Sequence, residues 1–151
     1  MSVEFGPGDQ LLALERKLER LAGGELKRTV MDAIAKEIEP LPDAVRKSAL
    51  DILPKRGGLN RVVAGQVVTE QKTPNSVKVF MVGKKRMREL LRLDRGLVRH
   101  PVYADPAKTR KQWKWVNQAV PQRFWSRPVK QREDAIKAAV RAAMDELARK
   151  L

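Results

Sequence analysis

The chain has 151 residues, of which 42% are hydrophobic, enough for one domain with a single modest core. It contains no cysteine, which excludes disulfides, thiolate metal sites and cysteine nucleophiles. The first residues lack the basic start and apolar stretch of a signal peptide, and no apolar run approaches the roughly 18 residues that span a bilayer. We therefore expect a protein of the cytoplasm, or of a structure assembled there.

The net charge of +14 is concentrated in the middle of the chain. Residues 1–53 hold 8 Lys and Arg against 10 Asp and Glu, residues 54–132 hold 20 against 4, and residues 133–151 hold 4 against 4. A basic block of this kind is typical of a protein with a polyanionic partner, nucleic acid first. A solvated face, or one half of a protein interface, fits the composition equally well.

Residues 1–53 are expected to be helical. A first helix is predicted between a capping Asp9 and the Gly23-Gly24 pair, because leucines recur there at three- and four-residue spacing: Leu11, Leu14, Leu18 and Leu21. A second apolar stripe runs from Leu26 to Ile38. Pro40 and Pro42 then interrupt the pattern, and a short third helix is expected from about Asp43 to Leu53.

The segment 53–59, Leu-Pro-Lys-Arg-Gly-Gly-Leu, is predicted to be a structural hinge. Pro54 stops the preceding helix, and Gly57 and Gly58 permit positive φ. A phosphate-binding loop is excluded because no Lys followed by Ser or Thr comes after spaced glycines.

Alternation with a period of two predicts a β-hairpin over residues 65–83, turning at 73–76. The nearly continuous apolar run at 79–82 indicates a strand covered on both faces. Residues 84–99 allow two interpretations, and we expect a short helix or turn to about Leu93 followed by a strand after Gly96. The alternative, one continuous helix, would place five basic residues on one face: Lys85, Arg88, Arg92, Arg95 and Arg99.

Residues 104–112 are polar and basic and are expected to form an exposed loop. Residues 113–116 are predicted to be a strand with Trp113 and Trp115 facing the same way. A final helix is predicted over 127–151, with an apolar stripe that begins at Ile136. The chain is thus expected to be one α+β domain over 1–151, helical in 1–53, mainly β in 59–120, with a small antiparallel sheet flanked by the N-terminal helices and a long C-terminal helix.

The inventory of reacting groups is poor. His100 is the single histidine, so paired-histidine chemistry and poly-histidine metal sites are excluded. A Ser–His–Asp set can be assembled on paper from Ser76, Ser126, His100 and Asp94, but no serine has the context of a nucleophile elbow. We expect His100 to be a structural, hydrogen-bonding residue, and we expect no catalytic residue, no metal and no cofactor.

The basic centre is the candidate surface for a partner or for DNA. Its cations can follow phosphates while Trp113 and Trp115 stack, or the tryptophans can pack in the core while the Lys and Arg heads remain in water. No helix-turn-helix is evident, and zinc fingers are impossible without cysteine or more histidine. The candidate residues are Lys84, Lys85, Arg86, Arg88, Arg92, Arg95, Arg99, Lys108, Arg110, Lys111 and Lys114.

Three segments together carry a resemblance to a known family. They are the Leu-Pro-Lys-Arg-Gly-Gly-Leu hinge at 53–59, Leu-Asp-Arg-Gly-Leu-Val-Arg-His-Pro-Val-Tyr at 93–103, and Phe-Trp-Ser-Arg-Pro at 124–128, which leads into an Ala-rich last helix. In this order they resemble the neck and tail-completion proteins of long-tailed bacteriophages, in particular those that infect actinobacteria. The resemblance covers roughly residues 10–151.

The resemblance implies a structural subunit of the virion, assembled in the host cytoplasm, that forms a ring, commonly a hexamer, between the head connector and the tail tube. DNA would pass through its channel, and no catalytic residues would be carried over. Backbone shaping is the implied role of Gly57, Gly58, Gly96 and Pro128. The alternatives are a tail terminator ring and a free basic DNA-binding protein.

A channel that lets DNA slide gains little from an adhesive wall, because each phosphate contact adds to retention. We therefore expect residues 84–114 to dock on protein, with transient DNA contact secondary. The acidic counterpart would lie on the next subunit or on a neighbouring ring. Candidates within this chain are glutamates of the N-terminal part: Glu15, Glu19, Glu25, Glu37 and Glu39.

Overall fold

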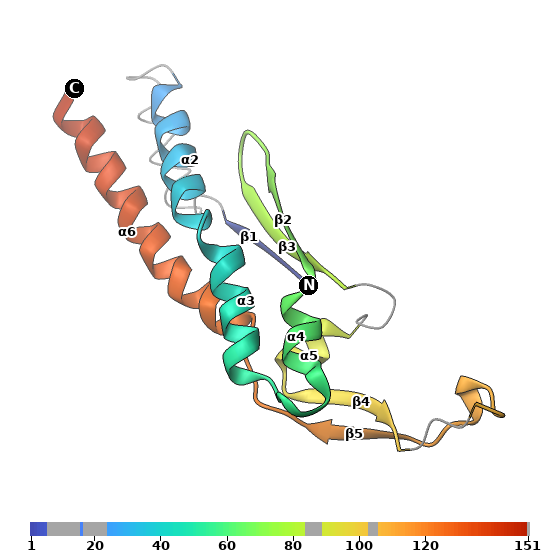
Figure 1. Ribbon diagram of the computed structural model, residues 1–151. Helices are drawn as coiled ribbons and strands as arrows, with labels where there is room; N and C mark the ends of the chain where they lie inside the picture. The colour runs from blue at the N-terminus through green and yellow to red at the C-terminus, as the bar shows by residue number, and fades with distance from the viewer. Residues whose placement is uncertain (6–15, 17–23, 84–88, 103–105, 151) are drawn as a thin grey trace.

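The computed structural model describes residues 1–5, 16, 24–83, 89–102 and 106–150 (Figure 1). In chain order its elements are β1 (Ser2–Phe5), α2 (Glu25–Ile38), α3 (Leu41–Ile52), a 3-10 turn (Arg56–Gly58), α4 (Leu59–Ala64), β2 (Val67–Lys72), β3 (Val77–Val82), α5 (Leu90–Asp94), β4 (Leu97–Pro101), a 3-10 turn (Arg110–Gln112), β5 (Trp115–Ala119) and α6 (Ser126–Lys150). The predicted α+β class, with antiparallel pairing, N-terminal helices and a long C-terminal helix, is confirmed, although the described strands form two small sheets where one was expected. The predicted first helix, with Asp9 and its leucines, lies outside the described residues.

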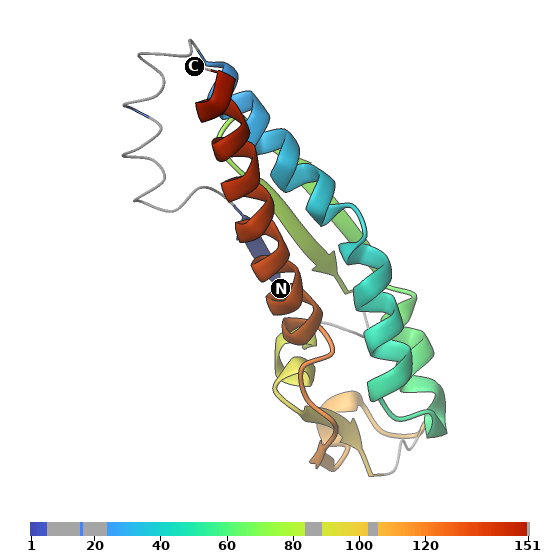
Figure 2. The same cartoon turned by 90° about the vertical axis from the view of Figure 1, so that its left-hand side faces the viewer.

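The helices α2 and α3 follow each other along one side of α6, which runs in the opposite direction (Figures 1 and 2). α2 ends at Ile38 and α3 begins at Leu41, with Pro42 in the first turn, where a missing amide donor costs nothing. The predicted third helix therefore begins two residues earlier than expected. An ion pair between Arg132 of α6 and Glu37 of α2, at 3.1 Å, joins the two helices.

The larger sheet has the strand order β1-β3-β2, and both pairings are antiparallel. The hairpin of β2 and β3 confirms the period-two prediction, and its turn is closed by hydrogen bonds between Thr73 and Ser76. The prediction that the run 79–82 is covered on both faces is wrong. Burial alternates along β3, because the described helices lie on one side of this sheet.

One apolar core joins the helices to the sheet. Its central members come from α2, α3, β3 and α6, and each is nearly or fully buried: Ile34, Ile38, Leu41, Val45, Val79, Ile136 and Val140. We call this part of the molecule, α2–α3 with the three-stranded sheet and α6, the body.

Two elements were missed from the sequence. Residues 2–5, placed in a helical region, form β1 and extend the sheet beyond β3. Residues 59–64, placed in a mainly β region, form the short helix α4 between Gly58 and Gly65, which packs on α3.

Within the described part of the chain, none of the helices is long and apolar enough to cross a membrane.

The segment after residue 88 follows the preferred interpretation rather than the continuous helix. α5 ends at Asp94, Gly96 has a φ of 92°, and β4 begins at Leu97. Arg95 and Arg99 therefore lie beyond the helix, and the single helical face of five cations does not form.

Candidate interaction surface

The carboxylate of Asp94 caps the last helix from a distance in sequence. Its Oδ1 accepts hydrogen bonds from the backbone N–H of Trp125, at 2.8 Å, and of Ser126, at 3.2 Å. Asp94 itself is buried. Amides at a helix start have no partner within the helix, and a carboxylate there also complements the helix dipole. Asp94 thus joins the end of α5 to the beginning of α6.

Gly96 is required for the same junction. The backbone N–H of Val120 donates to the Gly96 carbonyl at 2.9 Å, and the N–H of Arg123 donates to the Asp94 carbonyl at 2.8 Å. A Cβ at Gly96 would lie 2.5 Å from Cγ of Gln122 and 3.0 Å from the carbonyl oxygen of Val120. The positive φ and the close approach both exclude a side chain here.

The strands β4 and β5 form a separate two-stranded sheet, which with its connecting residues we call the arm (residues 97–119). It starts where α3 ends and α6 begins, and it runs outward from the body (Figure 1). Arg99 pairs with Asn117 and Pro101 with Trp115. The alternation places Leu97, Arg99 and Pro101 on one face of the arm, with the partner residues Trp115, Asn117 and Ala119 on that same face.

Arg99 stacks on Trp115 on this face. Its guanidinium carbon lies 5.3 Å from the ring centroid, within the range of a cation–π contact. The ring of Trp113 is the next neighbour, with centroids 6.1 Å apart and planes tilted by 34°. The two rings meet as expected, although Trp113 precedes β5 instead of belonging to it.

The candidate basic residues divide into three groups. Arg92, on α5, is paired with Glu89 at 3.3 Å. Arg95 and the arm residues Arg99, Lys108, Lys111 and Lys114 are exposed, while of Arg110 only the backbone is described. The remaining candidates lie outside the described residues: Lys84, Lys85, Arg86 and Arg88.

The residues predicted to shape the backbone occupy distinct positions. Pro54 follows the extended Leu53 that ends α3, and Gly57 and Gly58 have φ of 80° and 76°. Pro128 lies in the first turn of α6, where proline needs no amide partner.

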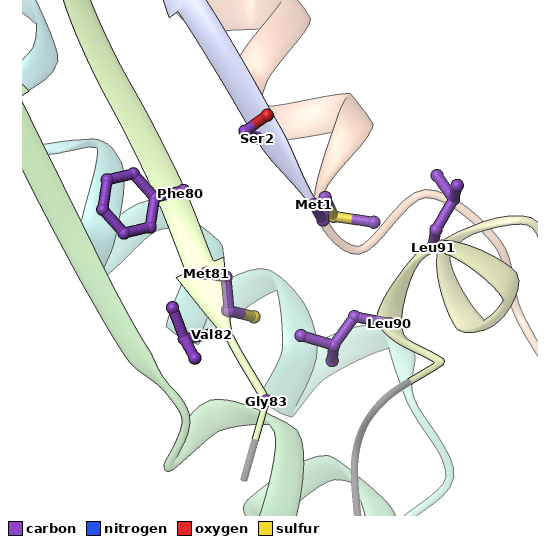
Figure 3. Close-up of a pocket in the computed structure, with 8 residues that line it drawn as sticks. All are labelled: Met1, Ser2, Phe80, Met81, Val82, Gly83, Leu90 and Leu91. Carbon is purple, nitrogen blue, oxygen red and sulfur yellow. The ribbon is translucent and has the colours of Figure 1, made fainter.

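An apolar hollow of about 500 Å³ lies between the three-stranded sheet and α5 (Figure 3). Leu91 and Val82 at its rim are each 53% exposed. Among the described residues, none that lines it has a side chain able to donate or accept a proton at neutral pH. Its lining residues are Met1, Ser2, Phe80, Met81, Val82, Gly83, Leu90 and Leu91.

Three of the four residues considered for a Ser–His–Asp set have structural partners. Asp94 serves the α6 cap, Nδ1 of His100 lies 3.0 Å from the Pro101 carbonyl oxygen, and the hydroxyl of Ser76 contacts that of Thr73. Among the described residues, no three His, Cys, Asp or Glu side chains gather as metal ligands would.

Two features of this surface were missed from the sequence, namely the Asp94 cap and the Arg99–Trp115 contact. The cap spans 31 residues and the stacked pair depends on the β4–β5 register, so neither has a local sequence signal.

Comparison of the chain with protein-family models, with curated proteins and with solved structures found no match in any of the three.

Proposed function

We propose that the chain is a structural subunit of a phage head–tail junction, a neck or tail-completion ring between the head connector and the tail tube. The proposal rests on the resemblance carried by residues 53–59, 93–103 and 124–128. Such a subunit works by shape and contact, so its important residues fix one element against another.

The observation that carries the proposal is the meeting of two of these segments. Asp94, in the segment 93–103, caps α6, which begins within the segment 124–128. Gly96 leaves room for residues 120–122, which lead into that helix. These two short motifs, far apart in the sequence, thus contact each other in the fold and form one structural junction. They connect the start of the arm to the start of α6 by hydrogen bonds, and a subunit that joins two rings requires such defined connections.

Ring formation needs a heterologous interface, in which one surface of a subunit binds a different surface of the next. The arm projects from the body, and the apolar hollow beside α5 is separate from it, so the molecule offers two unlike surfaces. Both are accessible in the described part of the chain.

Co-assembly is the decisive experiment. The chain is expressed with the connector and tail-tube proteins encoded beside it, and the products are viewed by electron microscopy. We expect rings seated on tube ends or on connectors, and portal, capsid and tail-tube genes as neighbours. A chain that neither joins these components nor has such neighbours would overturn the proposal.

The second candidate is a free DNA-binding protein, favoured by the 20 Lys and Arg against 4 acidic residues in 54–132. Phosphate binding makes affinity fall steeply with salt. Tight monomeric binding to duplex DNA, abolished when Arg88, Arg92 and Arg95 are reversed in charge, would support this candidate against the ring.

A further inference from the structure

One face of the arm is uncovered by the described residues. Arg99, Asn117 and Ala119 are exposed, and Leu97 is 41% exposed. An isolated two-stranded sheet is marginally stable in water and gains from a third strand or from packing against another element. This face, defined by Leu97, Arg99, Pro101, Trp115, Asn117 and Ala119, is therefore suited to a partner.

The guanidinium of Arg99 is preorganised to bind an anion through two of its oxygens. Stacking on Trp115 holds the guanidinium plane, so less side-chain freedom is lost when its N–H groups bind. No described carboxylate forms an ion pair with it, unlike Arg92 and Arg132. Its edge is available for a bidentate contact with a carboxylate or a phosphate.

The chain around this face is strongly basic. Residues 95–127 contain eight Lys and Arg and one acidic residue, Asp105. The neighbouring Asp94 is buried and is already bound to two amides. The occupant must therefore be acidic.

A second copy of the chain is the less suitable occupant, although Glu25 and Glu39, named above as acidic counterparts, are exposed. Each copy carries +14, and many of the described carboxylates are already paired within the chain. Bringing the arm onto another copy would place like charges together. The internal pairs are Glu4–Lys78, Glu37–Arg132, Asp43–Arg46, Glu89–Arg92, Glu133–Lys137 and Glu146–Lys150.

Nucleic acid is also a poor fit. Base stacking needs an open aromatic face, whereas Trp115 carries Arg99 and borders Trp113. Leu97 and Pro101 lie beside the cation, and a phosphate backbone offers no apolar surface to cover them. Trp and Arg together are typical of the centre of protein interfaces.

We infer that the arm face docks on an acidic protein surface of a different polypeptide, one that presents a carboxylate to Arg99 among apolar side chains. The partner's place in a neighbouring ring rests on the proposed function, whereas its chemistry follows from the arm. The self-contacts of a ring then use other surfaces of this molecule.

The test compares two fluorescently labelled probes at about 0.15 M salt, where surface charge is partly screened. One is a random copolymer of glutamate and tyrosine, and the other is a duplex DNA of equal total charge. Arg99→Lys keeps the charge but loses the planar fork. We expect it to weaken copolymer binding by about tenfold and to leave DNA binding almost unchanged.

Arg141→Lys is the matched control, because Arg141 is an exposed arginine in the second half of α6, whereas the arm adjoins the start of that helix. It should bind both probes as the wild type does, and circular dichroism should show all three proteins folded. Equal copolymer binding by Arg99→Lys and the wild type, no copolymer binding at all, or tighter binding of DNA than of copolymer would each overturn the inference.

The same variants separate this inference from the proposed function. If Arg99→Lys does not affect co-assembly, the proposed role at the phage head–tail junction is retained, but the arm face is excluded as its docking site. If the copolymer binds in an Arg99-dependent way but the chain does not co-assemble, the inferred docking chemistry is retained and the role at the phage head–tail junction is excluded.

Discussion

The body and the arm are built on different principles. In the body, apolar side chains from α2, α3, β3 and α6 meet in one core, and Ile38, Leu41 and Val79 are fully buried. In the arm, two strands face water on one side and present Arg99 and exposed Leu97. The body's apolar side chains are largely buried, whereas on one face of the arm Leu97, Arg99 and Asn117 remain exposed.

The junction between them combines buried apolar side chains, among them Leu93, Val120 and Phe124, with a few polar contacts. Asp94, Gly96 and the amides of Trp125 and Ser126 fix where the arm leaves the body. Changes in the body should therefore lower stability, changes in the junction should lower it less, and changes on the arm face should mainly affect binding.

The largest effect is expected in the core. Ile34 is 1% exposed. The substitution Ile34→Ala removes its apolar contacts and leaves a cavity, so it should lower the free energy of unfolding by about 2–5 kcal/mol. Leu97→Ala, the arm control, should change it by less than about 1 kcal/mol, because Leu97 is 41% exposed. Chemical denaturation measures both, and equal losses would contradict the division between body and arm.

The second effect concerns Gly96. Gly96→Ala combines a strained φ of 92° with a Cβ 2.5 Å from Gln122, and should cost about 2–4 kcal/mol. Gly57→Ala is the matched control, since φ is 80° there but no atom lies within 4 Å of the added Cβ, so about 1 kcal/mol is expected. Thermal denaturation should rank the two variants, and a Gly57→Ala loss as large as that of Gly96→Ala would argue against the close approach.

The third effect tests the distant cap. Asp94→Ala leaves the amides of Trp125 and Ser126 without their acceptor and should cost about 1–2 kcal/mol. Asp94→Asn keeps an acceptor oxygen and should lose less. Urea unfolding monitored by helical circular dichroism checks the order, and an Asp94→Ala protein as stable as the wild type would exclude the cap.

The smallest effect concerns the edge strand β1. Hydrogen bonds from the side chains of Ser76 and then Lys78 lower the pKa of the Glu4 carboxyl below its ordinary 4.5. Because the folded pKa is lowered, the contribution to stability is present above about pH 4.5 and is lost as the pH falls through the folded value. Glu4→Gln should therefore melt slightly below the wild type at pH 7, and the difference should disappear in acid. A difference that grows in acid would contradict this sign.

Local signals in the sequence were sufficient for much of the body. The apolar spacing from Leu26 to Ile38, the prolines at 40 and 42, and the period-two run before Gly83 each act within a few residues, and α2, α3 and the hairpin follow them. Gly96 likewise marks the change from helix to strand.

The failures are long-range. β1 has only four residues and exists because β3 offers an edge about 75 residues later in the chain. The run 79–82 is apolar, but its burial alternates, with Val79 and Met81 buried and Val82 exposed, which no local pattern reveals. The Asp94 cap and the Arg99–Trp115 contact join segments that only the folded chain brings together.

Hydrogen exchange of backbone amides tests the division between body and arm most directly. In the chain alone, amides of α2, β3 and α6 should exchange only through global unfolding, while those of β4 and β5 should exchange orders of magnitude faster. On co-assembly with the neighbouring ring proteins, the arm amides should become protected and those of the body should change little. Uniform protection in the chain alone, or an arm that stays unprotected in the assembly, would contradict the account.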